Sequence, residues 1–136
     1  MFVLDTNFIS EMRRPERVDP KVVAWAGATP VEQTFLSAIT ILEVELGTLL
    51  MERRDKVKAT VYRNWVDLNV LPRYQGRILP VDTAIAQCCA RLHVPNPRSE
   101  RDALIAATAI VHGLTVVTRN VADFAPMGVK LLNPWA

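Results

Sequence analysis

The stretch Asp102-Ala-Leu-Ile-Ala-Ala-Thr-Ala-Ile-Val-His-Gly-Leu-Thr-Val-Val-Thr118 holds the pattern that decides the fold. Its first part repeats apolar residues at helical spacing, at Leu104, Ile105, Thr108, Ala109 and Val111. Gly113 then offers the left-handed conformation that ends many helices. The following run, Thr115 to Thr118, is short and largely apolar, as in a strand that is covered on both faces. The stretch therefore predicts one helix–strand unit of a parallel α/β sheet.

Four more runs of this strand type occur along the chain, at residues 2–4, 34–37, 78–81 and 129–132. Helical patterns separate them: a short one after Pro20, one over Thr40–Arg54, one from Val57 to Pro72 and one that Asp82 starts as an N-cap. No repeat or Gly/Ser-rich linker divides the sequence. We therefore expect a single three-layer α/β domain over residues 1–136, with a central parallel sheet flanked by helices.

The composition favours a globular protein with a phosphate-containing partner. Half of the 136 residues are hydrophobic and 22% are charged, which argues against disorder. The formal net charge of +2 is far from that of a histone-like binder. Arginine nevertheless supplies 12 of the 16 basic residues, and its planar guanidinium suits bidentate binding of phosphate.

The cysteines and apolar runs bear on location. Cys88 and Cys89 are adjacent and form no disulfide framework, so we expect a reducing, cytoplasmic setting. The two histidines lack the spacing of a zinc site. Residues 103–117, the longest apolar run, are too few to span a bilayer, and we expect no membrane association. Acidic residues also interrupt any signal-peptide core near the N-terminus.

Acidic residues lie where predicted strands end or the neighbouring helices begin: Asp5, Glu43, Asp102 and Asp123. Asp5 ends the first strand, and Asp123 follows the fourth strand after Thr118 and Asn120. Glu43 is expected in the first turn of its helix, and Asp102 opens the helix before the fourth strand. Because ligands bind beyond the carboxyl ends of such strands, we expect the four carboxylates at one edge of the sheet.

Such a cluster has a chemical meaning. Carboxylates that are packed together repel one another unless a cation lies among them. Oxygen ligands without Cys or His favour Mg²⁺ or Mn²⁺. An ion held in this way can activate a water and stabilise charge on a phosphate. The pattern therefore predicts metal-dependent hydrolysis of phosphodiester bonds.

Helix capping is the competing interpretation. Three pairs have the spacing of a capping box or an acidic variant of it: Thr40 with Glu43, Ser99 with Asp102, and Asn120 with Asp123. An Asx turn could account for Asp5. Asp82 also follows a strand, but its position before an apolar helix favours simple N-capping.

The sequence resembles the PIN domain and, more narrowly, the VapC toxins of toxin–antitoxin pairs, close to their FitB-like branch. Three segments carry the resemblance: Phe2–Ser10, Ser37–Gly47 and Asp102–Phe124. It covers nearly the whole chain, apart from residues 57–77. The resemblance implies that Asp5, Glu43, Asp102 and Asp123 are the catalytic and metal-holding acids, with Asp5 and Asp102 as the most consistent direct ligands. Thr118 and Asn120 match supporting polar positions.

The resemblance further implies a Mg²⁺- or Mn²⁺-dependent endoribonuclease, the toxin of a type II VapBC pair, which hydrolyses RNA with a water activated by the carboxylate-held metal. The implied partners are RNA, a second copy in a homodimer, and a VapB-type antitoxin that alone contacts operator DNA. From their position after Asp5, Arg13 and Arg14 are expected to guide the RNA backbone.

Two alternatives stay open. The first is a dimeric binding module that presents a DNA-binding antitoxin for transcriptional regulation and keeps only vestigial nuclease activity. The second is a DNA-directed nuclease, since no residue pattern identifies a reader of the RNA 2′-hydroxyl.

Overall fold

The central sheet of the computed structural model, which describes residues 1–136, has five short parallel strands. They are β1 (Phe2–Leu4), β2 (Thr34–Ser37), β3 (Ile78–Leu79), β4 (Thr115–Val117) and β5 (Leu131–Leu132). Their order is β3-β2-β1-β4-β5, so the chain builds outward from β1 on one side and then returns to pair β4 on the other. The switch point between β1 and β4 is where sheets of this type bind ligands.

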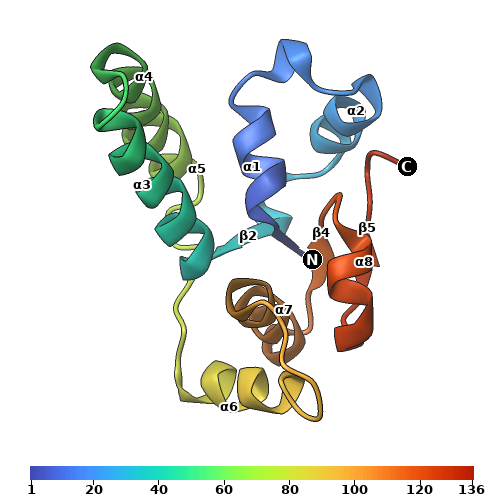
Figure 1. Ribbon diagram of the computed structural model, residues 1–136. Helices are drawn as coiled ribbons and strands as arrows, with labels where there is room; N and C mark the ends of the chain where they lie inside the picture. The colour runs from blue at the N-terminus through green and yellow to red at the C-terminus, as the bar shows by residue number, and fades with distance from the viewer.

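Helices cover both faces of this sheet (Figure 1). The longer ones are α1 (Thr6–Met12), α2 (Pro20–Ala28), α3 (Ala38–Glu52), α4 (Lys56–Trp65), α6 (Thr83–Leu92) and α7 (Glu100–His112). A π-helical turn, Val66–Val70, joins α4 to α5 (Leu71–Arg73), and α8 (Val121–Phe124) follows β4. In Figure 1, α6 and α7 lie below the sheet, and α1 to α5 lie above it. The three-layer α/β fold is as predicted.

The strands are apolar because both of their faces are buried. Successive residues of a strand point to opposite faces, and here they enter two different cores. Val3 and Val116 pack in the core beneath the sheet, with the residues of α6 and α7. Leu4 and Val117 pack in the core above it, with residues of α1, α2 and α3. These four side chains are at most 1% exposed, and each contributes about 1.5–3 kcal/mol of burial free energy.

The observed element ends correct several predictions. The strands predicted at 78–81 and 129–132 are shorter than expected. The helix predicted from Thr40 begins at Ala38, because the buried Ser37 caps it and accepts a hydrogen bond from the Ile39 amide at 3.0 Å. Glu43 is therefore in the second turn of α3, and the capping box proposed for Thr40 and Glu43 is wrong. Gly113 does end α7 in the left-handed region, with φ of 67°.

Two helical segments differ more strongly from the prediction. The single helix expected from Val57 to Pro72 is divided, with a π-helical turn between α4 and α5. Helix α1 was not predicted, because only two of its seven residues, Phe8 and Ile9, are buried and so short a helix shows no clear period. No helix of the structure combines the length and the apolar character needed to cross a membrane.

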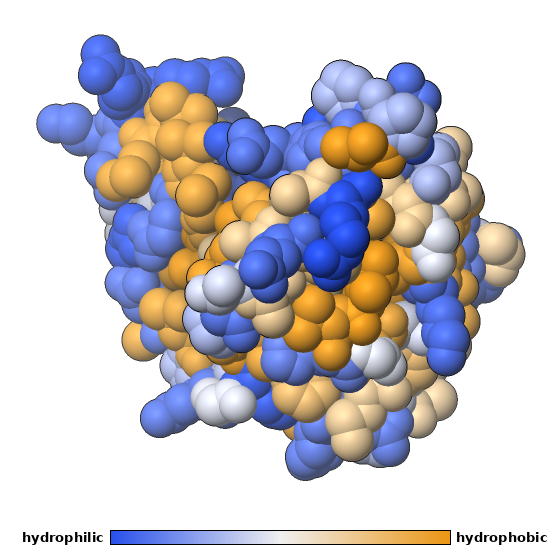
Figure 2. Space-filling model, turned by 90° about the horizontal axis from the view of Figure 1, so that it is seen from below, coloured by the Kyte–Doolittle hydropathy of each residue, from blue (hydrophilic) through white to orange (hydrophobic).

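The α3–α4 hairpin leaves an apolar surface uncovered. Arg63 on α4 binds Glu45 on α3 through two N–O contacts of 2.9 and 3.0 Å, which hold the hairpin together. Four leucines of α3 are nevertheless exposed: Leu42, Leu46, Leu49 and Leu50. Figure 2 shows hydrophobic atoms grouped on the left, the side on which α3 and α4 lie in Figure 1.

Candidate active site

Asp5 lies at the switch point of the sheet and is 5% exposed. Its amide donates to the Val117 carbonyl at 2.9 Å, which continues the pairing of β1 with β4 by one residue. Its carboxylate accepts two hydrogen bonds, from the Thr118 hydroxyl and from the Thr6 amide, both at 2.8 Å. The strand pairing therefore fixes where this acid lies, and the two bonds fix how its carboxylate is oriented.

The surroundings of Asp5 make its negative charge costly. Burial raises the pKa of this carboxyl from 3.8 to about 6, although the hydrogen bonds from Thr118 and Thr6 oppose the rise. The charges of Asp102 and Glu43 raise the pKa further. A carboxylate held in this way is stabilised by a cation placed among the acids.

Asp102 and Asp123 belong to the same group of acids. Burial raises the pKa of Asp102, and the charges of Asp123 and Glu43 add to the effect. Asp102 is half-buried, whereas Asp123 is exposed at the rim. The Ser99 hydroxyl accepts a hydrogen bond from the Asp102 amide at 3.5 Å, so this predicted cap is present at the start of α7. Capping here involves the backbone of Asp102 and leaves its carboxylate within the acidic group.

Glu43 is oriented by a residue that the sequence reasoning missed. The Thr6 hydroxyl lies 2.7 Å from Glu43 Oε1 and donates to it, and it lies 3.1 Å from the Thr40 hydroxyl. Arg101 contacts the other carboxylate oxygen of Glu43 at 3.8 Å. Thr6 thus touches two of the four predicted acids, Asp5 through its amide and Glu43 through its hydroxyl. Its only sequence signal was its place directly after Asp5.

Thr118 connects the polar residues around Asp5. Its hydroxyl oxygen accepts from the Asn120 amide at 2.9 Å and from Asn7 Nδ2 at 3.4 Å, while the hydroxyl donates to Asp5. The Asn120 side chain makes no capping hydrogen bond, so the capping box suggested for Asn120 and Asp123 is absent. Asn7 Oδ1 is buried without a hydrogen-bond partner, an unsatisfied acceptor beside the site.

Arg13 and Arg14 follow directly after α1. The guanidinium of Arg13 lies over the ring of Tyr62 on α4, 4.3 Å from its centroid. Arg13 and Arg14 both line a basic hollow of about 410 Å³, together with Arg17 and Arg119. Neither Arg13 nor Arg14 has an acidic side chain within ion-pair distance, whereas Arg119 is paired with Glu11. Arg13 also lines a small cleft together with Glu43, so this unpaired cation lies close to one of the acids.

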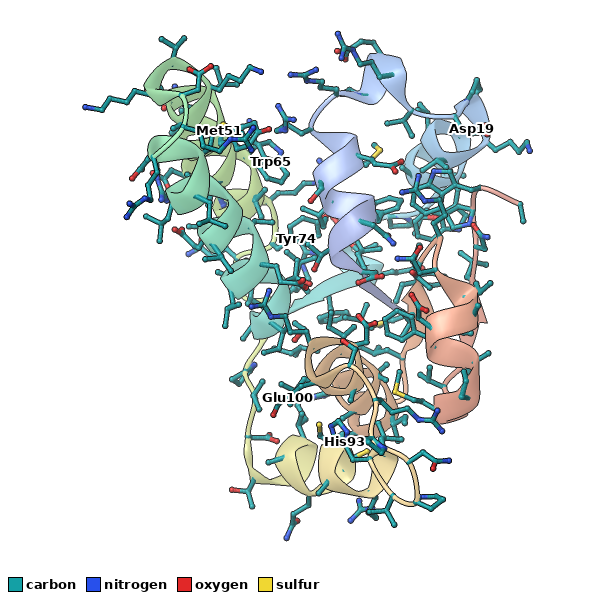
Figure 3. The ribbon with its side chains drawn as sticks, in the orientation of Figure 1. Asp19, Met51, Trp65, Tyr74, His93 and Glu100 are labelled. Carbon is teal, nitrogen blue, oxygen red and sulfur yellow. The ribbon has the colours of Figure 1, made fainter.

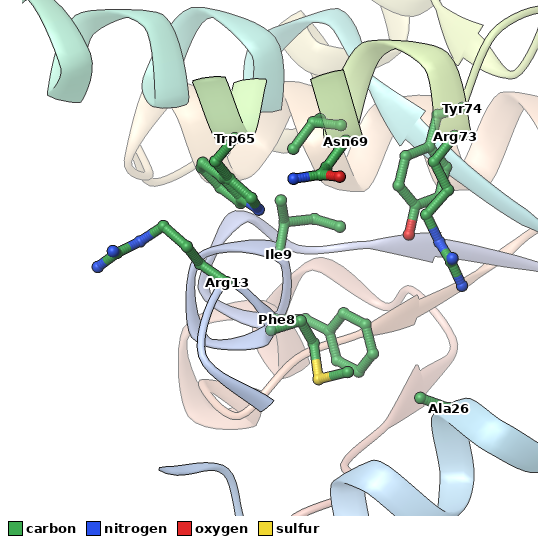
Figure 4. Close-up of a pocket in the computed structure, with 10 residues that line it drawn as sticks. Phe8, Ile9, Arg13, Ala26, Trp65, Asn69, Arg73 and Tyr74 are labelled. Carbon is green, nitrogen blue, oxygen red and sulfur yellow. The ribbon is translucent and has the colours of Figure 1, made fainter. Parts of the chain in front are cut away.

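An apolar groove of about 280 Å³ runs between α1 and the α4–α5 segment. Figure 3 shows Trp65 and Tyr74 in the space between the hairpin and α1. In the close-up of Figure 4, Phe8 and Ile9 of α1 lie opposite Trp65, Asn69 and Tyr74. Seven of its ten lining residues are hydrophobic, so the groove suits an apolar segment of another chain better than a polyanion.

The donor set fits a hard divalent cation. The candidate ligands are carboxylate oxygens, and neighbouring acids help to raise the pKa values of Asp5 and Asp102, an effect that a cation would reverse. No three Asp, Glu, His or Cys side chains are grouped closely enough to hold one ion among them. Mg²⁺ is suited to such a site, because it is commonly bound by one or two carboxylates and keeps several waters.

Comparison with known proteins finds a matching family model, similar protein sequences and a similar solved structure. The family model described as the PIN domain matches residues 2–127. The VapC ribonuclease Y4jK of Sinorhizobium fredii is 38% identical, over 99% of this chain and 98% of its own length. The toxin FitB of Neisseria gonorrhoeae is also 38% identical, over 99% of each chain. A solved structure of FitAB bound to an IR36 DNA fragment has a TM-score of 0.86 and 37% identity, covering 100% of this chain and 96% of that one.

Proposed function

Because the chain belongs to the PIN domain family, we propose that it is a divalent-metal-dependent endoribonuclease and the toxin of a VapBC-type toxin–antitoxin pair. The observation that carries this proposal is the buried Asp5 at the switch point, with Glu43, Asp102 and Asp123 close enough to shift pKa values within the group. Relatives named as a VapC ribonuclease and a toxin support it. The 136 residues act as one domain in the cytoplasm, where the buried free thiols of Cys88 and Cys89 stay reduced.

In this proposal Asp5 and Asp102 would hold Mg²⁺ or Mn²⁺, and Glu43 and Asp123 would complete the site through water. The bound ion supplies charge stabilisation at the phosphate and lowers the pKa of a water. Its fit rests on the oxygen-only donors and on the repulsion among the acids.

The neighbouring side chains orient these acids. Thr118 and the Thr6 amide hold the two oxygens of Asp5, and the Thr6 hydroxyl holds Oε1 of Glu43. Glu43 serves either as a ligand or as the base that takes a proton from the attacking water. Asn120 supports the site through its backbone amide, which donates a hydrogen bond to the Thr118 hydroxyl oxygen. Arg13 and Arg14 bind phosphates of the RNA backbone, since both are unpaired cations.

Three kinds of partner besides RNA belong to the same proposal. A VapB-type antitoxin occupies the apolar groove between α1 and α4–α5, which is open and largely hydrophobic. Operator DNA is contacted through that antitoxin, as supported by the similarity to FitAB bound to DNA. A second copy of the chain packs against the exposed leucines of α3 in a homodimer.

The test is cleavage of total cellular RNA by the purified chain with Mg²⁺. We expect discrete fragments that disappear with chelator and with Asp102→Asn purified in parallel. Fragments that persist in the Asp102→Asn sample would indicate a contaminating ribonuclease. No cleavage by folded protein that is free of antitoxin would contradict the proposal.

The open apolar groove also supports a second candidate, a dimeric module that presents a DNA-binding antitoxin and has only vestigial nuclease activity. Growth separates the two. Expression without the antitoxin should arrest cells if the chain is an active toxin and should leave growth unchanged if it is a scaffold. Asp5→Asn, expressed to the same level, is the matched control.

A further inference from the structure

We propose that the cleft between α1 and the α3–α4 hairpin is a nucleotide subsite, which receives one unstacked base of the RNA strand beside the cleavage site. This inference rests on the proposed ribonuclease function and adds the place where the substrate is read. The cleft measures about 160 Å³, and Ser10, Arg13, Glu43, Gly47, Tyr62 and Trp65 are among its lining residues.

The cleft is continuous with the acidic site. Glu43 lines the cleft, and the Glu43 carboxylate is held by Thr6, which also binds Asp5. A nucleotide whose phosphate lies at the acids would therefore have its base or its neighbour's base within reach of this cleft. Three of its eight lining residues are hydrophobic, against seven of ten in the apolar groove, which shares Arg13 and Trp65 with the cleft.

Arg13 and Tyr62 form a flat platform at the mouth of the cleft. The guanidinium lies 4.3 Å from the ring centroid, and one of its nitrogens is 3.5 Å from the Tyr62 hydroxyl. Tyr62 thus holds the guanidinium plane in one orientation, although no acid is paired with it. Proteins that bind single-stranded RNA stack unpaired bases on aromatic rings and on arginine planes of this kind.

Gly47 leaves α3 without a side chain where it lines the cleft. It is the tenth residue of a fifteen-residue helix, an interior position where glycine is less stable than alanine. Packing does not demand it, because a Cβ built there meets nothing within 4 Å. Because Gly47 has no side chain, the cleft stays open on the α3 side, and a ligand can approach the helix backbone closely.

The experiment fills the cleft and measures RNA binding separately from cleavage. Gly47→Leu adds a side chain where a Cβ meets nothing within 4 Å, and Gly27→Leu is the matched control, a helical glycine on α2 with an equally open Cβ position and away from the cleft. A fluorescent single-stranded RNA of mixed sequence is titrated in the Asp102→Asn background, and cleavage is measured with Asp102 intact. Tyr62→Ala tests the platform, and Tyr62→Phe keeps its ring.

We expect Gly47→Leu and Tyr62→Ala to weaken RNA binding and raise KM by about tenfold to a hundredfold, the size of one lost base stack. Gly27→Leu should stay within about twofold of the parent protein, and Tyr62→Phe, which keeps the ring and loses the hydroxyl contact with Arg13, should lose less binding than Tyr62→Ala. Unchanged melting temperature and unchanged Mn²⁺ affinity of Gly47→Leu would exclude a folding defect or a damaged metal site.

Other outcomes overturn the subsite in distinguishable ways. If the parent protein cleaves RNA and both cleft variants bind and cut it as the parent does, the nuclease stands and the subsite is wrong. If Gly47→Leu keeps RNA binding but loses the antitoxin, the cleft belongs to the protein partner. If the parent protein neither binds nor cleaves RNA, the proposed function fails and the subsite fails with it.

Discussion

At the residue scale, Asp5 belongs to the proposed metal site, but burial of its charge lowers the stability of the folded chain. Raising its pKa from 3.8 to about 6 corresponds to a native-state cost of about 3 kcal/mol at neutral pH. The native state binds this proton more tightly than the unfolded chain does. Without metal, the contribution of Asp5 to stability is therefore lost as the pH rises from about 4 to about 6.

We therefore predict that Asp5→Asn raises the free energy of unfolding in chelator at pH 7 by about 1–2 kcal/mol, less than the full cost because the amide fits the Thr118 hydroxyl less well. The same variant should lose Mn²⁺ binding and RNA cleavage together. Urea denaturation at pH 4.5 and pH 7 measures the first effect, and the gain should shrink at the lower pH. A variant that is less stable than the parent at pH 7 would show that the hydrogen bonds of the Asp5 carboxylate outweigh the cost of burying its charge.

Thr6 gives a second prediction at this scale, because its hydroxyl is the donor that holds Glu43. Thr6→Val has a similar shape without the hydroxyl, and it should lower kcat by about tenfold while KM changes little, the size of one lost hydrogen bond to a charged group. Thr6→Ser restores the donor and should restore most of the activity. Equal losses in both variants would mean that packing of the methyl group, and not the hydrogen bond to Glu43, is what matters.

At the scale of the elements, the sequence predicted the strands and α7 well because these segments carry strong local signals. Burial on two faces makes β1 and β4 apolar, and Gly113 ends α7 in the one conformation that favours glycine. The start of α3 was misplaced because Ser37 and Thr40 are both acceptable caps by type. Both residues are buried in the folded chain, and it is Ser37 that accepts the capping hydrogen bond, from the Ile39 amide.

The site was predictable in part for the same reason. Asp5 and Thr118 follow buried strands, so the sheet alone brings them together, and they are hydrogen-bonded at 2.8 Å. Thr6 and Arg101 reach Glu43 through side chains of separate helices, which no local pattern reports. The Arg13–Tyr62 contact joins residues 49 positions apart and was equally invisible.

Asp82 provides the prediction at the scale of the elements. Like Asp5 it is an acid that follows a strand, but it acts only as the N-cap of a helix. Its carboxylate accepts from the Ile85 amide at 2.9 Å at the start of α6, as the sequence predicted. Asp82→Ala should lower the free energy of unfolding by about 1 kcal/mol, the usual cost of a lost N-cap. RNA cleavage and Mn²⁺ affinity, measured beside Asp5→Asn, should be unchanged. A loss of activity beyond the loss of folded protein would instead place Asp82 in the site.

At the scale of the whole molecule, the exposed face of α3 matters more for the association of two chains than for the folding of one. Helix α3 is apolar nearly all round, yet Leu42, Leu46, Leu49 and Leu50 are between 37% and 54% exposed. Their exposure adds little to the stability of one chain, and such a group on a helix is the pattern of an association surface. One of the four acids, Glu43, lies on the same helix, so pairing through α3 would set two sites at a fixed separation.

We predict that Leu49→Glu converts the proposed homodimer into a monomer with little change in the free energy of unfolding of the chain, because Leu49 is 50% exposed. A buried charge at the interface costs several kcal/mol, enough to raise the dissociation constant of the dimer by more than a hundredfold. Light scattering coupled to size exclusion measures the mass, and circular dichroism checks the fold. Val23→Glu on α2, 40% exposed and distant in sequence, is the control and should stay dimeric. A dimer that survives Leu49→Glu and dissociates with Val23→Glu would move the interface from α3 to α2.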